Sequence, residues 1–492
     1  MILKKNNFVI ILSILGVAIA VLTISIIEDN LTIFIIFLLF LSLGGLICYL
    51  EDKSLISKIF IPAFIIRILF VILLYYILIY FNGIPFIINI TGITDDHQYF
   101  RAGQEVCNAW TNHVPYNWSR EFSYPGYIYT IGGLNYFTNL FGQFHHMIVL
   151  LFNCLVGSIT IIYVYKISQL VFGDKVAKTA STICIYFPYL LYYSSLILKD
   201  TIIYAVILAI IYYIYYLYYK KFNLVRIVLL FLFMYILSYF RDLSLYLIIT
   251  IVGIFSTTKL LSQKKTKIPL LRLIFPVFLI SVIVIIFKFN IFQDMLRILQ
   301  NIPYTIAKWD ARSINLALSD SLSAKYIFTL PPVIREIVKV IYLLIMPIPF
   351  WKWDINGLFN INLFCEGISG LILNIFIPFF AIGVVTASSH KYRQKSYLLL
   401  LNVIFFIMLL GILVPYPRYR IQILPCIIIF CALGIINKNK YKWIIELYFL
   451  LWCMIYITYI TTKYNFLVIL IFTLLVAFFI FKIKGYYKRP IR

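Results

Sequence analysis

The chain has 492 residues, 63% of them hydrophobic and 12% charged, with a mean hydropathy of +0.99 and a formal net charge of +24. A soluble protein of this length cannot bury so much apolar surface, so the composition excludes a soluble globular enzyme and predicts a membrane protein. The excess of lysine and arginine is typical of topology signals and lipid-headgroup contacts. We therefore expect membrane lipids, and no nucleic acid, as partners.

Candidate transmembrane helices follow one another along most of the chain. About 20 apolar residues cross the hydrocarbon core of a bilayer, and this rule predicts an all-α polytopic membrane protein with about 14 transmembrane helices. They cover residues 8–27, 31–50, 59–81, 146–172, 179–196, 201–219, 226–240, 243–260, 268–289, 361–385, 396–414, 418–437, 442–461 and 464–484. The first run is too long for a signal-peptide core and no small-residue cleavage site follows it, so we expect a retained helix.

Two long stretches, 82–145 and 290–360, lack this character and predict large extracytoplasmic loops that carry short helices. They separate N-terminal (1–81), central (146–289) and C-terminal (361–492) groups of transmembrane helices. In the second loop, the apolar piece from Val338 to Phe350 is too short to span a bilayer and contains two prolines. We expect this piece to be re-entrant or to lie on the membrane surface.

The distribution of charge predicts the orientation. With the N-terminus in the cytoplasm, the short inner loops and the tails hold about 25 lysines and arginines, and the short outer loops about five. About 14 of the 18 acidic residues then lie on the outer face. We therefore expect the functional site to be extracytoplasmic.

An acidic pair stands in the first loop, in the stretch "GITDDHQYFRAGQEVCNAW". An ionised Asp95 or Asp96 could accept a proton from an incoming hydroxyl group or hold a divalent cation against a phosphate. The structural alternative is that the pair caps the next helix, whose first amides lack partners. One aspartate could cap while the other acts, and the sequence does not decide which is the base or a metal ligand.

Four basic residues are predicted at the outer ends of spans, where positive charge is otherwise scarce. They are Lys199, Arg241, Arg418 and Arg420, the last two within "YPRYRIQILP". Asp200 and Asp242 follow the first two directly, so local ion pairs at helix N-termini are one alternative, and snorkelling to the headgroups is another. Converging guanidinium groups also suit a phosphate or pyrophosphate, because their forked donors match its oxygens.

These features together resemble the glycosyltransferase C superfamily: many spans, an acidic pair in the first large outer loop, a later "YPGY" and a late "PRYR" followed by a proline. The chain is most similar to the bacterial branch that includes lipid A aminoarabinose transferases and relatives of the protein O-mannosyltransferases. The resemblance implies a lipid-phosphate-linked sugar donor and an active site on the extracytoplasmic face of the bacterial inner (plasma) membrane. It also implies Asp95 or Asp96 as catalytic carboxylate, Arg418 and Arg420 as phosphate contacts, and Tyr124 of "YPGY" near the substrate. Relatives often have a basic residue and two prolines where this chain reads "SYPG".

We therefore expect a membrane glycosyltransferase that moves a sugar from a polyprenyl-phosphate donor to a glycan, lipid or protein acceptor by inverting displacement. The outer-loop aspartate takes the proton of the acceptor hydroxyl. Arg418 and Arg420 stabilise the leaving phosphate, with Arg241, Lys199 and Asp200 completing the substrate site. A divalent cation at Asp95 or Asp96 is the one cofactor considered.

Two other classes of function remain as alternatives. A lipid-linked glycan polymerase or ligase also uses outer arginines. A flippase or transporter of a lipid-linked glycan would explain the many spans but would scatter charges at mid-membrane depth. Apart from Arg67 and Lys166, the predicted spans are nearly uncharged, which favours the transferase.

Overall fold

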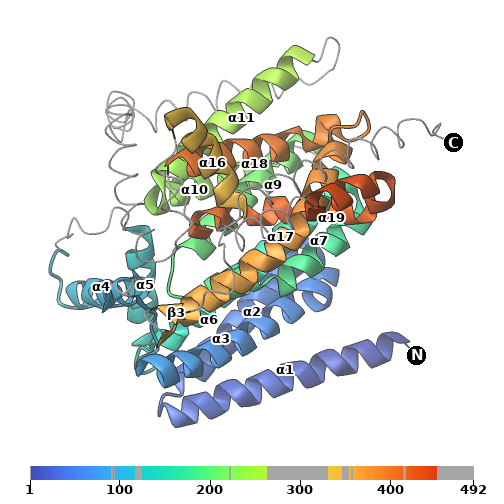
Figure 1. Ribbon diagram of the computed structural model, residues 1–492. Coiled ribbons are helices and arrows are strands. Elements are labelled where there is room, and N and C mark those ends of the chain that lie inside the picture. Colours follow the sequence, from blue (N-terminus) through green and yellow to red (C-terminus); the bar gives the residue numbers. More distant parts are fainter. Residues whose placement is uncertain are drawn as a thin grey trace.

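The computed structural model describes residues 2–89, 92–93, 95–116, 125–220, 223–262, 331–345, 354–355, 358–413 and 417–450. These residues form a helical bundle with two small antiparallel hairpins (Figure 1). In the hairpins, Ile88 of β1 (Ile88–Asn89) pairs with Ile93 of β2 (Gly92–Ile93), and Asp354 of β3 (Asp354–Ile355) with Phe359 of β4 (Leu358–Phe359).

The helices before the second large loop include long apolar helices and shorter ones. They are α1 (Ile2–Ile27), α2 (Thr32–Asp52), the π-helix η1 (Ile56–Phe60), α3 (Ile61–Asn82), α4 (Asp95–Thr111), α5 (Gly126–Thr138), α6 (His146–Phe172), α7 (Asp174–Tyr186), α8 (Pro188–Ser194), α9 (Asp200–Tyr219), α10 (Leu224–Phe240) and α11 (Asp242–Ser262). Those further along the chain are α16 (Pro332–Ile345), α17 (Ile361–Ala387), α18 (Arg393–Leu413), the 3-10 helix η2 (Pro417–Gln422), α19 (Leu424–Ile436) and the 3-10 helix η3 (Lys438–Tyr441).

Seven of the described helices are long and apolar enough to cross a membrane. They are Ile10–Ile27, Thr32–Asp52, Ile56–Asn82, His146–Phe172, Asp200–Tyr219, Ile361–Ala387 and Arg393–Gly411. An eighth span results if Leu424–Ile436 and Lys438–Leu450, which meet at an angle of 85°, are counted as one. The prediction of a helical, multi-pass membrane protein is thus confirmed. The count of fourteen stays a prediction, because spans 268–289 and 464–484 and part of 442–461 lie outside the described residues.

The predicted span 179–196 is not one helix. It contains the end of α7 and all of α8, with Phe187 in an extended conformation between them. Proline has no backbone N–H and disfavours a helical conformation in the residue before it, so Pro188 begins a new helix. The break lets α8 lead into the turn that carries Lys199 and Asp200.

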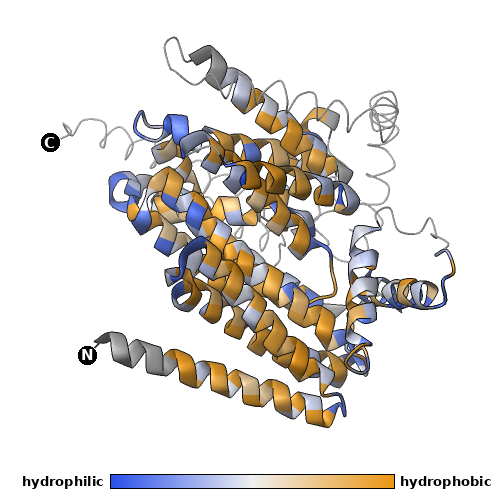
Figure 2. Ribbon diagram, turned by 180° about the vertical axis from the view of Figure 1, so that it is seen from behind, coloured by the Kyte–Doolittle hydropathy of each residue, from blue (hydrophilic) through white to orange (hydrophobic). Residues whose placement is uncertain are grey.

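The helices α6 and α9 form the centre of the bundle, because 78% of the apolar stretch of each is buried. In α1 the buried share of this stretch is 22%, and the helix lies at the edge (Figure 1). Apolar residues occupy the middles of the helices and hydrophilic residues gather toward their ends (Figure 2). Because apolar residues face both neighbours and surroundings, the pattern is that of a bundle in lipid.

The helices α17 and α19 approach one another closely at two glycines. A Cβ atom on Gly383 would overlap the backbone carbonyl of Phe430, and one on Gly434 would overlap that of Phe379. Small residues let transmembrane helices approach closely and gain backbone packing. This crossing holds the C-terminal segment, and η2 directly before it, against the bundle.

Both predicted loops carry short helices. In the first loop, α4 and α5 pack against one another at the end of the bundle where α6 begins (Figure 1). In the second, α16 starts earlier than the predicted piece at Val338 and exposes an apolar face of Val333, Ile334, Ile337 and Ile341. Its opposite side buries Lys339, whose Nζ lies 3.0 Å from a carboxylate oxygen of Glu336. Whether this amphipathic helix lies on the membrane surface or is part of a re-entrant piece stays a prediction, and residues 346–350 of that piece lie outside the described chain.

Candidate active site

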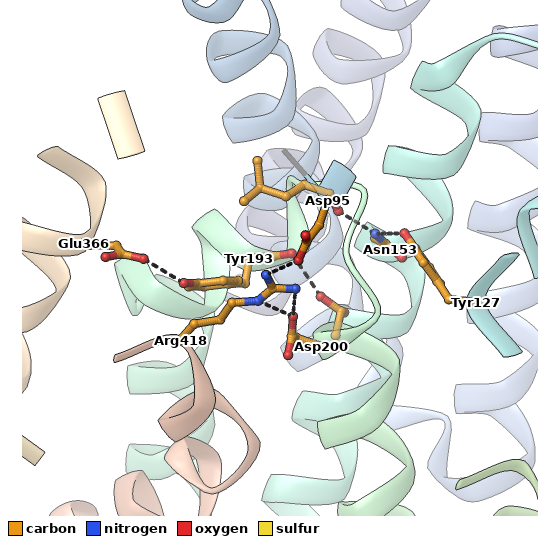
Figure 3. Close-up of polar contacts among 9 residues, drawn as sticks. Asp95, Tyr127, Asn153, Tyr193, Asp200, Glu366 and Arg418 are labelled. Carbon is orange, nitrogen blue, oxygen red and sulfur yellow. Dashed lines mark hydrogen bonds and ion pairs between the residues drawn. The ribbon is translucent and has the colours of Figure 1, made fainter. Parts of the chain in front are cut away.

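A guanidinium group joins two carboxylates that come from distant parts of the sequence (Figure 3). Nη1 of Arg418 in η2 lies 2.8 Å from Oδ2 of Asp95, the first residue of α4. Nε and Nη2 of Arg418 each lie 2.8 Å from Oδ2 of Asp200, the first residue of α9. The structure therefore brings three residues of the predicted site into direct contact.

Exposure distinguishes the two ion pairs of Arg418. The side chain of Asp95 is 56% exposed, whereas that of Asp200 is 2% exposed and that of Arg418 is 19%. Burial alone would lower the pKa of Arg418, but Asp200 and Asp95 raise it well above its usual value. The guanidinium group thus stays charged, fixed on its buried side by Asp200 and open to solvent on the side of Asp95.

The acidic pair has two separate placements. Asp96 is 3% exposed, and its Oδ2 accepts a hydrogen bond of 3.0 Å from the backbone N–H of Ile87, just before β1. Its Oδ1 accepts from the N–H of His97 at 2.9 Å. Asp96 therefore ties the start of α4 to the segment after α3, while the side chain of Asp95 is 56% exposed and contacts Arg418. This division matches the alternative in which one aspartate organises the backbone and the other can act.

The carboxylate of Asp200 owes its position to the start of α9. Acidic groups are stabilised at a helix N-terminus by the unpaired amides and the helix dipole. The turn before it is held by Thr201, whose hydroxyl donates to the backbone carbonyl of Tyr193 at 3.1 Å. A buried carboxylate in this place needs the cation that Arg418 supplies.

Lys199 and Arg241 add positive charge around this ion-pair cluster. The pKa of Lys199 is lowered to about 8, chiefly by burial; Asp200 opposes this shift, Arg241 and Arg418 add to it, and Asp95 opposes it. Nζ of Lys199 lies 5.9 Å from the ring centroid of Tyr99 on α4. Arg241 ends α10 and stacks on Tyr419, with its Cζ 4.4 Å from the ring centroid. The cations Lys199, Arg241 and Arg418 thus lie at the same end of the bundle as the carboxylates of Asp95 and Asp200.

Arg420 does not belong to this cluster. Its side chain is fully buried and its Cζ lies 4.7 Å from the ring centroid of Tyr189 in α8. Successive residues of a 3-10 helix are about 120° apart, so Arg418 and Arg420 leave η2 in different directions. The structure separates the two arginines that the sequence analysis treated as a pair.

A layer of polar contacts behind Arg418 was missed in the sequence. Tyr193 donates to Oε1 of Glu366 in α17 at 2.9 Å, and Asn153 in α6 donates to the hydroxyl of Tyr127 at 2.9 Å and to the carbonyl of Leu196 at 2.6 Å (Figure 3). An acidic residue inside an apolar span, such as Glu366, is a signal that could have indicated this layer. These bonds fix the α8–α9 turn that carries Lys199 and Asp200.

The side chains of two candidate residues lie outside the described part of the chain. Tyr124 lies outside the described residues, and the side chain of Asp242, at the start of α11, is also outside them. Among the described residues, no group of three or more histidine, cysteine, aspartate or glutamate side chains is arranged to hold a metal ion. The guanidinium group of Arg418 lies between Asp95 and Asp200. The divalent cation expected at Asp95 or Asp96 stays a prediction.

A comparison of the sequence with protein-family models and with curated proteins gives no match. The assignment of a function therefore depends on the chemistry of the residues around Arg418.

Proposed function

We propose that the chain is a membrane glycosyltransferase of the glycosyltransferase C type. It would transfer a sugar from a polyprenyl-phosphate donor to an extracytoplasmic acceptor in the inner (plasma) membrane of a bacterium, within a fold of about 14 spans. The observation that carries the proposal is the 2.8 Å contact between the solvent-exposed carboxylate of Asp95 and the guanidinium group of Arg418. A base and a phosphate-binding cation are the two groups that displacement of a sugar phosphate needs side by side.

In the proposed reaction, Asp95 acts as the general base. Its carboxylate accepts the proton of the acceptor hydroxyl while the hydroxyl oxygen forms a bond to the anomeric carbon. The bond between that carbon and the phosphate oxygen breaks on the opposite face, so the configuration inverts. The products are the glycosylated acceptor, the polyprenyl phosphate and a protonated Asp95, which returns its proton to water.

The cations of the cluster stabilise the leaving phosphate. Its negative charge grows as the sugar departs, so donors that are fixed in advance lower the barrier. Arg418 is held by Asp200 and presents Nη1 on the side of Asp95. A donor phosphate bound to Nη1 of Arg418 would take the place of the Asp95 carboxylate at that atom. Lys199 and Arg241 would add positive charge near the phosphate.

The proposal is tested by incubating the purified protein with a panel of polyprenyl-phosphate sugars and candidate acceptor glycans, lipids and peptides. Release of polyprenyl phosphate that depends on both substrates, and is lost in Asp95→Asn, supports the proposal. A polymerase or ligase would instead release polyprenyl pyrophosphate from a pyrophosphate-linked donor. Lack of turnover with every donor, together with transbilayer movement of one of them, would favour the flippase.

A transporter has one observation in its favour, the buried charge of Arg67 in α3. Its Nη1 donates to the backbone carbonyl of Ala63 at 3.2 Å. The space around it is tightly filled, since a Cβ on Gly157 would meet its Nε at 2.8 Å. Arg67 is thus packed tightly between α3 and α6, and the small space around it does not favour the passage of a lipid-linked glycan.

A further inference from the structure

A second polar cavity lies at the opposite end of the bundle from Arg418. It has a volume of about 690 Å³, within the range of roughly 300–1,000 Å³ typical of small-molecule sites. The charged residues in its wall come from α2, α6, α7, α10, α18 and the end of α9. They are Glu51, Lys166, Asp174, Lys220, Arg226 and Lys395.

The cavity is distinct from the candidate active site. The helix α9 starts at Asp200 and contributes Tyr212, Tyr216 and Tyr219 to the cavity near its other end. At a rise of 1.5 Å per residue, the distance along α9 from Asp200 to these tyrosines is roughly 18–28 Å. In the predicted orientation the cavity faces the cytoplasm.

A fixed arginine forms one side of this cavity. The Cζ atom of Arg226 lies 3.4 Å from the ring centroid of Tyr216, and its Nη1 donates to the hydroxyl of Tyr212 at 2.8 Å. Nη2 lies 3.7 Å from Glu51, whose other oxygen accepts a hydrogen bond of 3.0 Å from Tyr212. The side chain of Arg226 is 18% exposed. Its position is therefore set before any ligand arrives, which reduces the entropy lost on binding.

The remaining charges of the wall favour an anion. Glu51 is engaged by Arg226 and Tyr212, and Asp174 accepts a 2.6 Å hydrogen bond from Gln169. Four cations therefore face two carboxylates that already have donors. Arginine and lysine together with tyrosine hydroxyls are the donors that phosphate groups select.

We propose that this cavity binds a phosphate group, carried either by an anionic lipid headgroup or by a water-soluble ligand. The proposal goes beyond the transferase activity and does not depend on it. The four cations lie on four chain segments, α6, the end of α9, α10 and α18, that meet only in the folded bundle, so the site differs from the scattered lysines that mark loop orientation.

The test compares two double variants in nanodiscs of pure phosphatidylcholine. Lys220→Gln with Lys395→Gln removes two exposed cations of the cavity, and Lys175→Gln with Lys178→Gln removes two exposed cations of α7 that do not line it. Inorganic pyrophosphate is titrated calorimetrically as the soluble probe. Phosphatidic acid is added to the nanodiscs as the lipid probe, with bound lipid counted by native mass spectrometry. Both variants keep the Arg418 cluster intact, so binding there is common to both.

Binding that is weakened about tenfold in the cavity variant and unchanged in the α7 variant is the expected result. If pyrophosphate shows this difference, the ligand is water-soluble; if only phosphatidic acid shows it, the ligand is a headgroup. Equal loss in both variants, or no binding of either probe to the unmodified protein, would overturn the proposal.

Discussion

Asp95 and Arg418 are 323 positions apart in the chain, yet their side chains lie 2.8 Å from one another. One belongs to a helix that covers the end of the bundle and the other to the 3-10 helix that precedes α19. Their contact brings an early and a late part of the sequence into one site. The first predictions concern the residues of this site.

For Asp95, replacement by Asn should lower turnover about 10²- to 10⁴-fold, the usual contribution of a general base. Folding should persist, because the side chain is half exposed and Arg418 keeps its pair with Asp200. Steady-state rates with the matching donor and acceptor measure the effect. Glu105→Gln is the control, since Glu105 is exposed on the same helix. Near-native turnover in Asp95→Asn would remove the aspartate from the mechanism.

Asp96 should affect stability instead. Asp96→Ala removes the side-chain oxygens that accept hydrogen bonds from the backbone N–H groups of Ile87 and His97, which costs about 1–3 kcal/mol. We expect a lower Tm and a residual activity well above that of Asp95→Asn. Comparing the two variants by thermal unfolding and by turnover decides the assignment. A greater loss of turnover in a fully folded Asp96→Ala protein would exchange the two roles.

Arg418 and Arg420 should respond differently to lysine. Arg418→Lys keeps the charge beside buried Asp200 but cannot contact Asp200 and Asp95 with a fork of donors, so donor binding and kcat should both fall. Arg420→Lys loses a stacked guanidinium over Tyr189 and should lower the Tm with less effect on donor affinity. Donor titrations on both proteins measure this split. Arg101→Lys, with a side chain 74% exposed on α4, is the control. Native affinity and rate in Arg418→Lys would place the phosphate site elsewhere.

Lys199 should give the reaction an alkaline limit. Its pKa of about 8 means that the site loses one positive charge as the pH rises through that value. The value of kcat/KM reports groups of the free enzyme, so it should fall above pH 8, by about tenfold if the charge contacts the phosphate. Lys199→Arg keeps its charge and should move this limit beyond pH 9.5. A pH profile from 6 to 10 for both proteins is the measurement, and an unchanged limit in Lys199→Arg would assign it to another group.

The close approach of α17 and α19 at Gly434 can be tested by adding one methyl group at this position. Gly434→Ala places a Cβ against the backbone carbonyl of Phe379, so α17 and α19 must separate. We expect a loss of about 1–3 kcal/mol in stability, seen as a lower Tm in detergent. Gly45→Ala in α2, where nothing lies within 4 Å, should leave the Tm nearly unchanged. Equal Tm values for the two variants would contradict the close crossing.

Hydropathy and charge in the sequence were enough to predict a helical membrane protein and to select Asp95, Lys199, Asp200, Arg241 and Arg418 as residues at one end of it. They could not predict that Asp95 and Asp96, neighbours with the same charge, differ in exposure. Asp96 accepts a hydrogen bond from the backbone N–H of Ile87, a contact that arises only when the segment after α3 folds against α4. The separate directions of Arg418 and Arg420 arise from a 3-10 turn where we expected the start of a span.

The break at Pro188 could have been predicted from the sequence, because a proline in the interior of a predicted helix removes a backbone hydrogen bond and often ends the helix, although Pro378 stays inside α17. The pairing of Tyr193 with Glu366 was not, since it depends on how α8 packs against α17. Contacts between distant segments follow from tertiary packing, which hydropathy alone does not encode.

The burial of Asp200 has a consequence for the biogenesis of the protein. Its carboxylate is 2% exposed and its cation arrives 218 positions later in the chain. A nascent chain that ends before residue 417 has the central helices but no partner for this charge, and an unpaired buried carboxylate costs several kcal/mol. The end of α9 that carries Asp200 should therefore stay hydrated, or the carboxylate protonated, until the C-terminal segments have been inserted. Completion of the bundle and completion of the site are then a single late event in synthesis.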